Sequence, residues 1–95
     1  AIADYNEAIR LKPDSAIIHN NRGAAYLALG QYQKAVEDFS EAVKIKPDYV
    51  DAYYNRANVY FDHMNKEDGC NDAQKACELG KCDLLEKVKG KGYCS

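Results

Sequence analysis

The sequence lacks any long uninterrupted run of apolar residues, although hydrophobic types make up 46% of its 95 residues. A helix that crosses a bilayer needs about 20 predominantly apolar residues, so we expect no membrane-spanning helix. The opening residues also lack a basic stretch followed by an apolar core, so we expect no signal peptide among them. With 29% charged residues, the composition is typical of a folded chain, and the length is enough for one domain.

An excess of basic charge is also missing. Thirteen lysines and arginines are balanced by fifteen aspartates and glutamates, and the formal net charge is -2. Proteins that bind nucleic acids usually present a basic face, because phosphate contacts supply much of their affinity. The only basic concentration is Lys87, Lys89 and Lys91, a spacing more typical of a solvated tail. We therefore predict no nucleic-acid partner.

Catalytic motifs are missing as well. The chain has no Ser-His-Asp arrangement and no glycine-rich phosphate loop, and its acidic residues recur periodically rather than in a converging pair. Of its two histidines, His19 is expected to be packed in a helix and His63 to be exposed. We predict a protein that is not an enzyme, with no catalytic residue, no metal site and no cofactor.

The sequence does contain an internal repeat of 34 residues. Aligning residue 1 with residue 35 brings identical residues together over the next fourteen positions, and the same offset places Arg22 on Arg56. Self-similarity at a fixed period of this size is the signature of repeat architectures. The identical pairs in the first stretch are Ala1/Ala35, Asp4/Asp38, Glu7/Glu41, Ala8/Ala42, Lys12/Lys46, Pro13/Pro47 and Asp14/Asp48.

Each period is predicted to form two helices, because its apolar residues recur at three- and four-residue spacing. The first helix is expected from about Ser15 to Leu29, where Gly30 interrupts it. The second is expected from Gln33 to Ile45, where a Lys-Pro-Asp sequence ends it. Neither helix can bury its apolar stripe alone, so neighbouring pairs must stack. The predicted fold class is all-α, an α-α superhelix of antiparallel helix pairs.

These positions resemble the tetratricopeptide repeat, abbreviated TPR, whose pattern ends in Ala, an aromatic residue and Pro. The second copy is degenerate, with Lys81 where Pro is expected, and arginine replaces the usual leucine in both copies. The matching residues of the first copy are His19, Arg22, Gly23, Tyr26, Ala35, Phe39 and Pro47. Those of the second are Tyr53, Arg56, Ala57, Tyr60, Gly69 and Ala73.

The resemblance implies one TPR-like domain over residues 1–95. Its expected parts are the second helix of a partial repeat (1–14), a repeat (16–49), a degenerate repeat (50–81), and a capping helix with a tail (82–95). Within the cap, Asp83 and Glu86 resemble a capping box that opens a helix from Leu84 to about Lys89. The apolar stripe of residues 1–12 lacks half of its packing partners, so we expect a mobile or oligomer-forming edge there.

No cysteine precedes residue 70, and all four lie in the C-terminal part at Cys70, Cys77, Cys82 and Cys94. Four cysteines allow three pairings. If the chain turns back near Gly80, a nested arrangement puts Cys77 beside Cys82 and Cys70 beside Cys94, within disulfide reach. Buried or free thiols are an alternative, and a zinc site is a third, although only the pair 77/82 approaches its ligand spacing. Disulfides imply a periplasmic or secreted location, and free thiols a cytoplasmic one.

Charged residues also recur at the repeat period. Arg22 and Arg56 lie one period apart, as do Asp4, Asp38 and Asp72. We hypothesise that arginine-aspartate pairs link the stacked helices, with simple solvent exposure as the alternative.

In the TPR family the first helix of each pair lines a concave groove that holds a peptide. The resemblance places Ile17, Asn20, Asn21, Ala24, Leu27 and Ala28 there from the first copy, and Asp51, Tyr54, Asn55, Asn58, Phe61 and Asp62 from the second. Asparagine amides both donate to and accept from an extended backbone, and aromatic rings offer apolar area. Solvated positions without a partner are the alternative. Asp51 and Asp62 favour a neutral or mildly basic ligand. One TPR subclass binds the C-terminal carboxylate of its partner through a cluster of Lys, Arg and Asn side chains. Only Asn55 matches that cluster here, so we do not predict this kind of ligand.

The sequence therefore predicts a scaffold that binds a protein or an extended peptide in this groove. The alternative is a structural module that assembles into oligomers through residues 1–12. A third class, a metal- or redox-responsive module, would use the cysteines.

Overall fold

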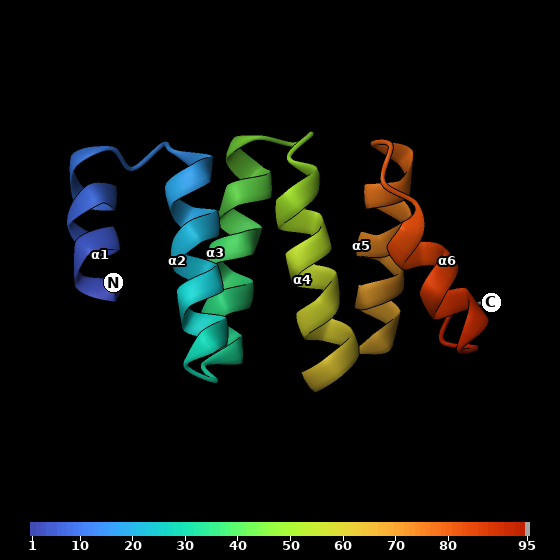
Figure 1. The fold of residues 1–95 in the computed structure, drawn as a ribbon. Coiled ribbons are helices and arrows are strands. Elements are labelled where there is room, and N and C mark those ends of the chain that lie inside the picture. The colour runs from blue at the N-terminus through green and yellow to red at the C-terminus, as the bar shows by residue number, and fades with distance from the viewer. Residues whose placement is uncertain (95) are drawn as a thin grey trace.

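The computed structural model describes residues 1–94, and this range folds into six α-helices without a β-strand (Figure 1). The predicted all-α fold class is confirmed. No helix in the described range is both long and apolar enough to cross a bilayer. The helices are α1 (Ile2–Leu11), α2 (Ala16–Ala28), α3 (Tyr32–Ile45), α4 (Val50–His63), α5 (Lys66–Glu78) and α6 (Asp83–Gly90).

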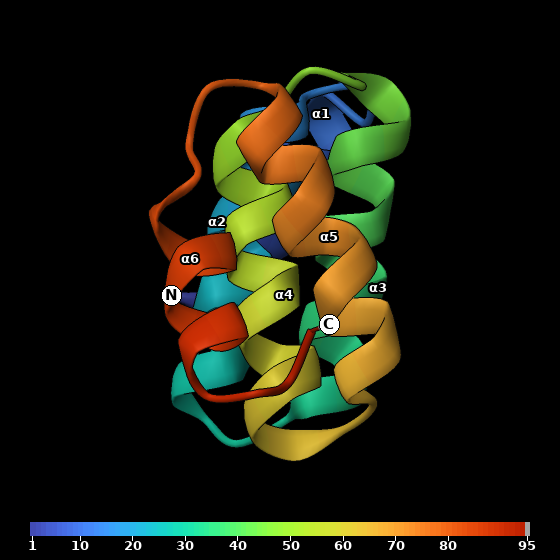
Figure 2. The same cartoon turned by 90° about the vertical axis from the view of Figure 1, so that its right-hand side faces the viewer.

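The helices stack along one direction into a body of 42 × 26 × 16 Å. Each helix packs against its neighbour in sequence, and α2 also contacts α4 directly. Seen along the stack, α2, α4 and α6 lie on one side and α3 and α5 on the other (Figure 2). We call the outer surface formed by α2, α4 and α6 the even-helix face.

Local sequence signals set both ends of α2 and of α5. The Ser15 hydroxyl accepts a hydrogen bond from the Ile18 backbone N–H at 3.3 Å and caps α2. Asn65 caps α5 by accepting from two backbone N–H groups, and the helix begins at Lys66. Gly30 and Gly80, with φ of 76° and 108°, follow α2 and α5, as expected for residues that end a helix in the left-handed region.

The predicted capping box of α6 is wrong. The helix begins at Asp83 itself, and Cys82 is the N-cap residue without a side-chain hydrogen bond. The carboxylates of Asp83 and Glu86 therefore lie inside the first turn, where they face the positive end of the helix dipole instead of capping a backbone N–H.

Small residues at the helix contacts allow the hairpins to pack closely. The Phe39 ring of α3 is fully buried against Gly23 of α2. The second hairpin reverses this arrangement, because Phe61 of α4 lies over Gly69 of α5. This reversal explains the degenerate second copy: its aromatic residue comes from the other helix. Fully buried alanines fill the remaining contacts, at Ala35, Ala42, Ala52, Ala57, Ala73 and Ala76.

The ends of the stack differ. α1 packs against α2 and has no fully buried residue, and its last residue Leu11 is 69% exposed. At the other end, α6 buries Leu84, Leu85 and Val88 against the second hairpin. Within residues 1–94, a helix with buried apolar residues therefore covers the second hairpin, whereas α1 contributes no fully buried residue to the first.

Candidate binding face

The even-helix face carries a repeated stripe of accessible positions on α2 and α4. Spacings of four, three and four residues place the members of each stripe on one side of their helix. On α2 the predicted groove residues Ile17, Asn21, Ala24 and Ala28 are exposed. Their counterparts 34 positions later are Asp51 and Asp62, which are exposed, and Asn55 and Asn58, which are half-buried.

A chain of side-chain amides lies beneath this stripe. The Asn55 amide donates to the Asn20 carbonyl oxygen at 3.1 Å, and the Asn20 amide donates to the Tyr49 hydroxyl at 3.4 Å. Asn20 is buried and uses both of its polar groups in these bonds. The predicted groove residue Asn20 therefore fixes α2 against α4, and Asn55 keeps its own carbonyl oxygen for another partner.

Three of the predicted groove residues, Leu27, Tyr54 and Phe61, are half-buried because neighbouring elements cover part of each. Tyr54 and Phe61 pack against the cluster that contains Leu84, Leu85 and Val88, and the Lys81 ammonium lies 4.5 Å from the Tyr54 ring centroid. Leu27 packs against the cluster around Phe39 in the same way. The prediction of α6 as a cap did not include this contact, by which α6 covers Tyr54 and Phe61.

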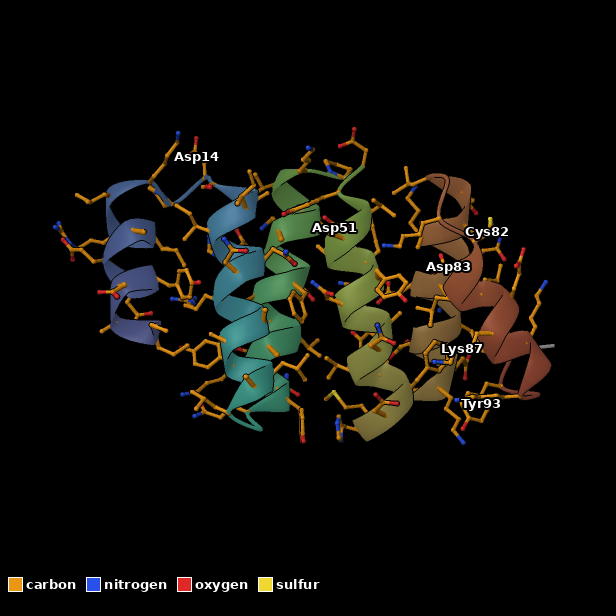
Figure 3. The ribbon with its side chains drawn as sticks, in the orientation of Figure 1. Asp14, Asp51, Cys82, Asp83, Lys87 and Tyr93 are labelled. Atoms are coloured by element: carbon orange, nitrogen blue, oxygen red, sulfur yellow. A yellow bond between two sulfur atoms is a disulfide. The ribbon has the colours of Figure 1, made fainter. Side chains whose placement is uncertain are left out.

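A hollow of about 100 Å³ lies between α4 and the C-terminal part of the chain. The predicted groove residues Asn58, Phe61 and Asp62 line it from α4, and Leu84, Lys87, Val88, Lys91 and Tyr93 line it from the other side. Asp51 lies at the N-terminal end of α4, and Lys87 and Tyr93 lie closer to its C-terminal end (Figure 3). Adding the 34-residue period to the first residue of α4, Val50, gives position 84, one residue after the start of α6. This signal could have placed α6 beside α4 on the even-helix face.

The hypothesis of arginine-aspartate pairs is confirmed within both hairpins. Arg22 donates to both carboxylate oxygens of Asp38 at 2.8 and 2.7 Å, and Arg56 donates to Asp72 at 2.7 Å twice. Asp4, the third periodic aspartate, is exposed on α1 outside these pairs. Two parallel bonds to one carboxylate fix the geometry of each pair.

Each arginine also reaches a third helix. The remaining guanidinium nitrogen of Arg22 donates to Asn6 on α1 at 2.8 Å, and that of Arg56 donates to Ser40 on α3 at 2.9 Å. Hydrogen bonding to Asp72 raises the pKa of Arg56. Burial raises the pKa of Asp72, and the bonds from Arg56 offset part of that effect. These pairs are scaffold contacts that hold the even-helix face in shape.

His19 lies next to the first pair and is buried, as predicted. One ring nitrogen, Nε2, is 3.0 Å from the Pro13 carbonyl oxygen, and the other, Nδ1, is 3.7 Å from an Asp38 carboxylate oxygen. His63 is exposed, as predicted, and stacks on the Tyr32 ring at 3.6 Å between centroids.

The four cysteines form two nested disulfides, Cys70–Cys94 and Cys77–Cys82, with Cα atoms 5.7 and 3.9 Å apart. The first links α5 to the segment after α6, and the second spans the turn between α5 and α6. Over the described range, no group of three or more His, Cys, Asp or Glu side chains is arranged to hold a metal ion.

Comparison with known proteins identifies the repeat. A sequence model described as TPR repeat matches residues 1–30 and 25–63, which is about two thirds of the chain. The chain belongs to the tetratricopeptide repeat family. The resemblance inferred from the 34-residue period is thereby confirmed. This TPR chain is also 46% identical over 37 residues to human tetratricopeptide repeat protein 28, over 39% of this chain but only 2% of the length of that protein.

Solved TPR structures superpose on most of the chain. The TPR domain of Arabidopsis OM64 has a TM-score of 0.86 at 30% identity, over 98% of this chain and 77% of that one. The Sgt2 TPR domain from Aspergillus fumigatus has a TM-score of 0.82 at 30% identity, over 90% and 59%. The first TPR of Spaghetti (RPAP3), solved bound to the HSP90 peptide SRMEEVD, shares the fold with a TM-score of 0.86 at 23% identity, over 97% and 73%.

Proposed function

We propose that this TPR chain is a scaffold that binds an extended peptide or protein segment along the even-helix face. One observation carries the proposal: accessible positions recur in register on α2 and α4, while the residues beneath them are packed and hydrogen-bonded. Such a preformed surface orders few side chains of its own on binding, which lowers the cost of association. The HSP90 peptide bound by the first TPR of Spaghetti supports this use of the fold.

The chemistry of the face favours a partner with mixed polarity. Ile17 is 60% exposed and offers apolar area, and Asn21 and Asn58 offer amide groups for a peptide backbone. Asp51 favours a neutral or basic residue nearby. The proposed role is binding, because amides, apolar groups and isolated charges position a partner but supply no nucleophile paired with a base.

A binding measurement on matched variants tests this proposal. A random peptide library is displayed against the immobilised protein, and selected peptides are titrated calorimetrically against variants. Asp51→Ala and Asn58→Ala should each weaken binding about fivefold or more, as expected for loss of a direct contact. Gln74→Ala, exposed on α5, should leave the affinity unchanged. Peptides that bind all three variants as tightly as wild type, or a library that yields no binder, would contradict the proposal.

We also propose that the protein works in an oxidising compartment, such as the periplasm or the cell exterior. The two disulfides support this location, because cytosolic reductants keep most thiols reduced. Alkylation of the denatured protein without reductant, directly after isolation from its native cells, provides the test. Four unmodified cysteines are expected, and four alkylated ones would contradict the location.

The second candidate function is self-assembly through residues 1–12. It is favoured by α1, which has no fully buried residue and exposes Leu11. Light scattering from micromolar to millimolar concentration distinguishes the candidates. A molar mass that rises with concentration, and that Leu11→Asp returns to the monomer value, would support assembly. A constant monomer mass would exclude it.

A further inference from the structure

The segment after α6 is held on α5 by a covalent bond. Residues 91–94 turn back at Gly92, which has φ of 80°, and Cys94 is disulfide-bonded to Cys70 on α5. This bond places Tyr93 beside the hollow, with its ring centroid 6.0 Å from that of Phe61 and 4.3 Å from the Lys66 ammonium. One wall of the hollow therefore depends on the oxidation state of two cysteines.

The charges around the hollow favour an anionic group. Lys87 and Lys91 line it, and neither has a carboxylate oxygen within 4 Å among residues 1–94. Asn58 adds an amide, and Asp62 is the one carboxylate in the lining. Two ammonium groups against one carboxylate leave a positive balance, and apolar lining residues such as Val88 suit the methylene groups of a side chain.

We propose that this hollow is a subsite for an acidic side chain of the partner, and that the Cys70–Cys94 disulfide is its redox switch. The inference deepens the proposed function, because the hollow lies at the α6 end of the even-helix face. In the oxidised protein Tyr93 forms part of the wall of the hollow. In the reduced protein Tyr93 leaves, the wall is lost and the acidic side chain is held less tightly.

The non-covalent contacts of this segment are too few to replace the disulfide. The Tyr93 backbone N–H donates to the Val88 carbonyl oxygen at 3.0 Å, and the Gly92 backbone N–H donates to the Lys89 carbonyl oxygen at 3.0 Å. Both bonds belong to a single turn, and the Tyr93 side chain is 38% exposed, so its aromatic and cation-π contacts are weak. A single turn held by so few contacts opens readily.

The second disulfide does not attach Tyr93 to α5. Cys77 and Cys82 are five residues apart across the turn between α5 and α6, and opening this bond leaves Cys94 attached to Cys70. The chain therefore supplies its own matched control for the switch.

Reduction follows ordinary thiol-disulfide exchange with a dithiol. A thiolate of the reductant attacks one sulfur of the Cys70–Cys94 bond and forms a mixed disulfide, and the cysteine released as thiolate takes up a proton. The second thiol of the reductant then displaces the other cysteine. Two electrons and two protons pass to the protein, which gains two thiols, and the reductant leaves as a cyclic disulfide. Both cysteines are partly exposed, which gives the reductant access.

Movement of Tyr93 can be measured without any partner. Hydrogen exchange by NMR is followed in wild type, in Cys70→Ser/Cys94→Ser and in Cys77→Ser/Cys82→Ser, each with and without dithiothreitol. The Tyr93 amide should exchange at least tenfold faster in reduced wild type and in Cys70→Ser/Cys94→Ser. It should stay protected in oxidised Cys77→Ser/Cys82→Ser, and the Gly23 amide should stay protected throughout, which separates release from global unfolding. A Tyr93 amide that reduction leaves unchanged would overturn the switch.

The subsite is tested with hexaglutamate as the probe, titrated into ¹⁵N-labelled protein at low salt. Shifts should centre on Lys87 and Lys91, weaken at least threefold in Lys87→Gln/Lys91→Gln and after reduction, and persist in Lys89→Gln, whose side chain is outside the lining. Equal binding by wild type and Lys87→Gln/Lys91→Gln would overturn the subsite. Because this probe needs no selected peptide, the result is separate from that of the proposed function.

Discussion

At the residue scale, two glycines and two phenylalanines decide how closely the hairpins pack. A Cβ atom added at Gly23 would lie 2.7 Å from a Phe39 ring carbon and 3.2 Å from the Ala35 carbonyl oxygen. Phe39 is fully buried, so its ring has no free space to move into. Glycine in this helix therefore serves close approach rather than flexibility.

Replacing Gly23 with alanine should destabilise the protein by about 1–3 kcal/mol, because the added methyl group overpacks the core. The matched control is Gly90→Ala, where an added Cβ meets nothing within 4 Å. That variant should be stabilised by up to about 1 kcal/mol from helix propensity. Urea denaturation measures both, and two variants of equal stability would contradict the packing argument.

At the element scale, the arginines link each hairpin to the helix before it. Arg56 joins α4 to α5 through Asp72 and to α3 through Ser40. Its side chain is only 17% exposed and that of Asp72 only 6%, so removing one partner leaves a poorly solvated charge. We expect the pair to specify helix register more than it adds net stability.

A double-mutant cycle separates these two effects. Asp72→Ala should cost about 3 kcal/mol, because it leaves the Arg56 guanidinium without its carboxylate. The double variant Arg56→Leu/Asp72→Ala should be less destabilised than the sum of the two single variants. As a control, Glu7→Ala, which breaks the exposed pair with Arg10, should leave stability unchanged. Strict additivity at Arg56 and Asp72 would show that the pair does not couple the helices.

The helices were largely predictable from the sequence, and the site was predictable only in part. Periodic apolar residues and Gly30 and Gly80 located α2 to α5, because these signals are local. The half-burial of Tyr54 and Phe61 was missed, since it depends on α6, which only the 34-residue period, and no matching residue type, places on the even-helix face. The burial of Asn20 also escaped prediction, because its partners come from α4 and the loop before it.

At the scale of the whole molecule, the stack has one covalently closed end. Each hairpin contacts only its neighbours, so the stability of a repeat array depends on its terminal elements. The disulfides hold α6 and residues 91–94 on α5, and α6 in turn covers the apolar parts of α4. The shape of the even-helix face around α6 therefore depends on the two disulfides.

The two disulfides should differ in their contribution to stability. Cys70 and Cys94 are 24 residues apart and Cys77 and Cys82 only five, so the first closes the larger loop in the unfolded chain. In the loop-entropy view, Cys70→Ser/Cys94→Ser should cost about 3 kcal/mol and Cys77→Ser/Cys82→Ser about 2 kcal/mol. Thermal unfolding followed by circular dichroism measures the difference. A larger loss from the shorter loop would contradict this ranking.

The most direct measurement is NMR mapping of a library-selected peptide on ¹⁵N-labelled protein. If the even-helix face is the binding surface, amide shifts on saturation will concentrate on α2, α4 and α6, around Ile17, Asp51 and Asn58. The amides on the sides of α3 and α5 that face away from α2 and α4 will change little. Shifts concentrated on α3 and α5, or on α1 alone, would contradict the account.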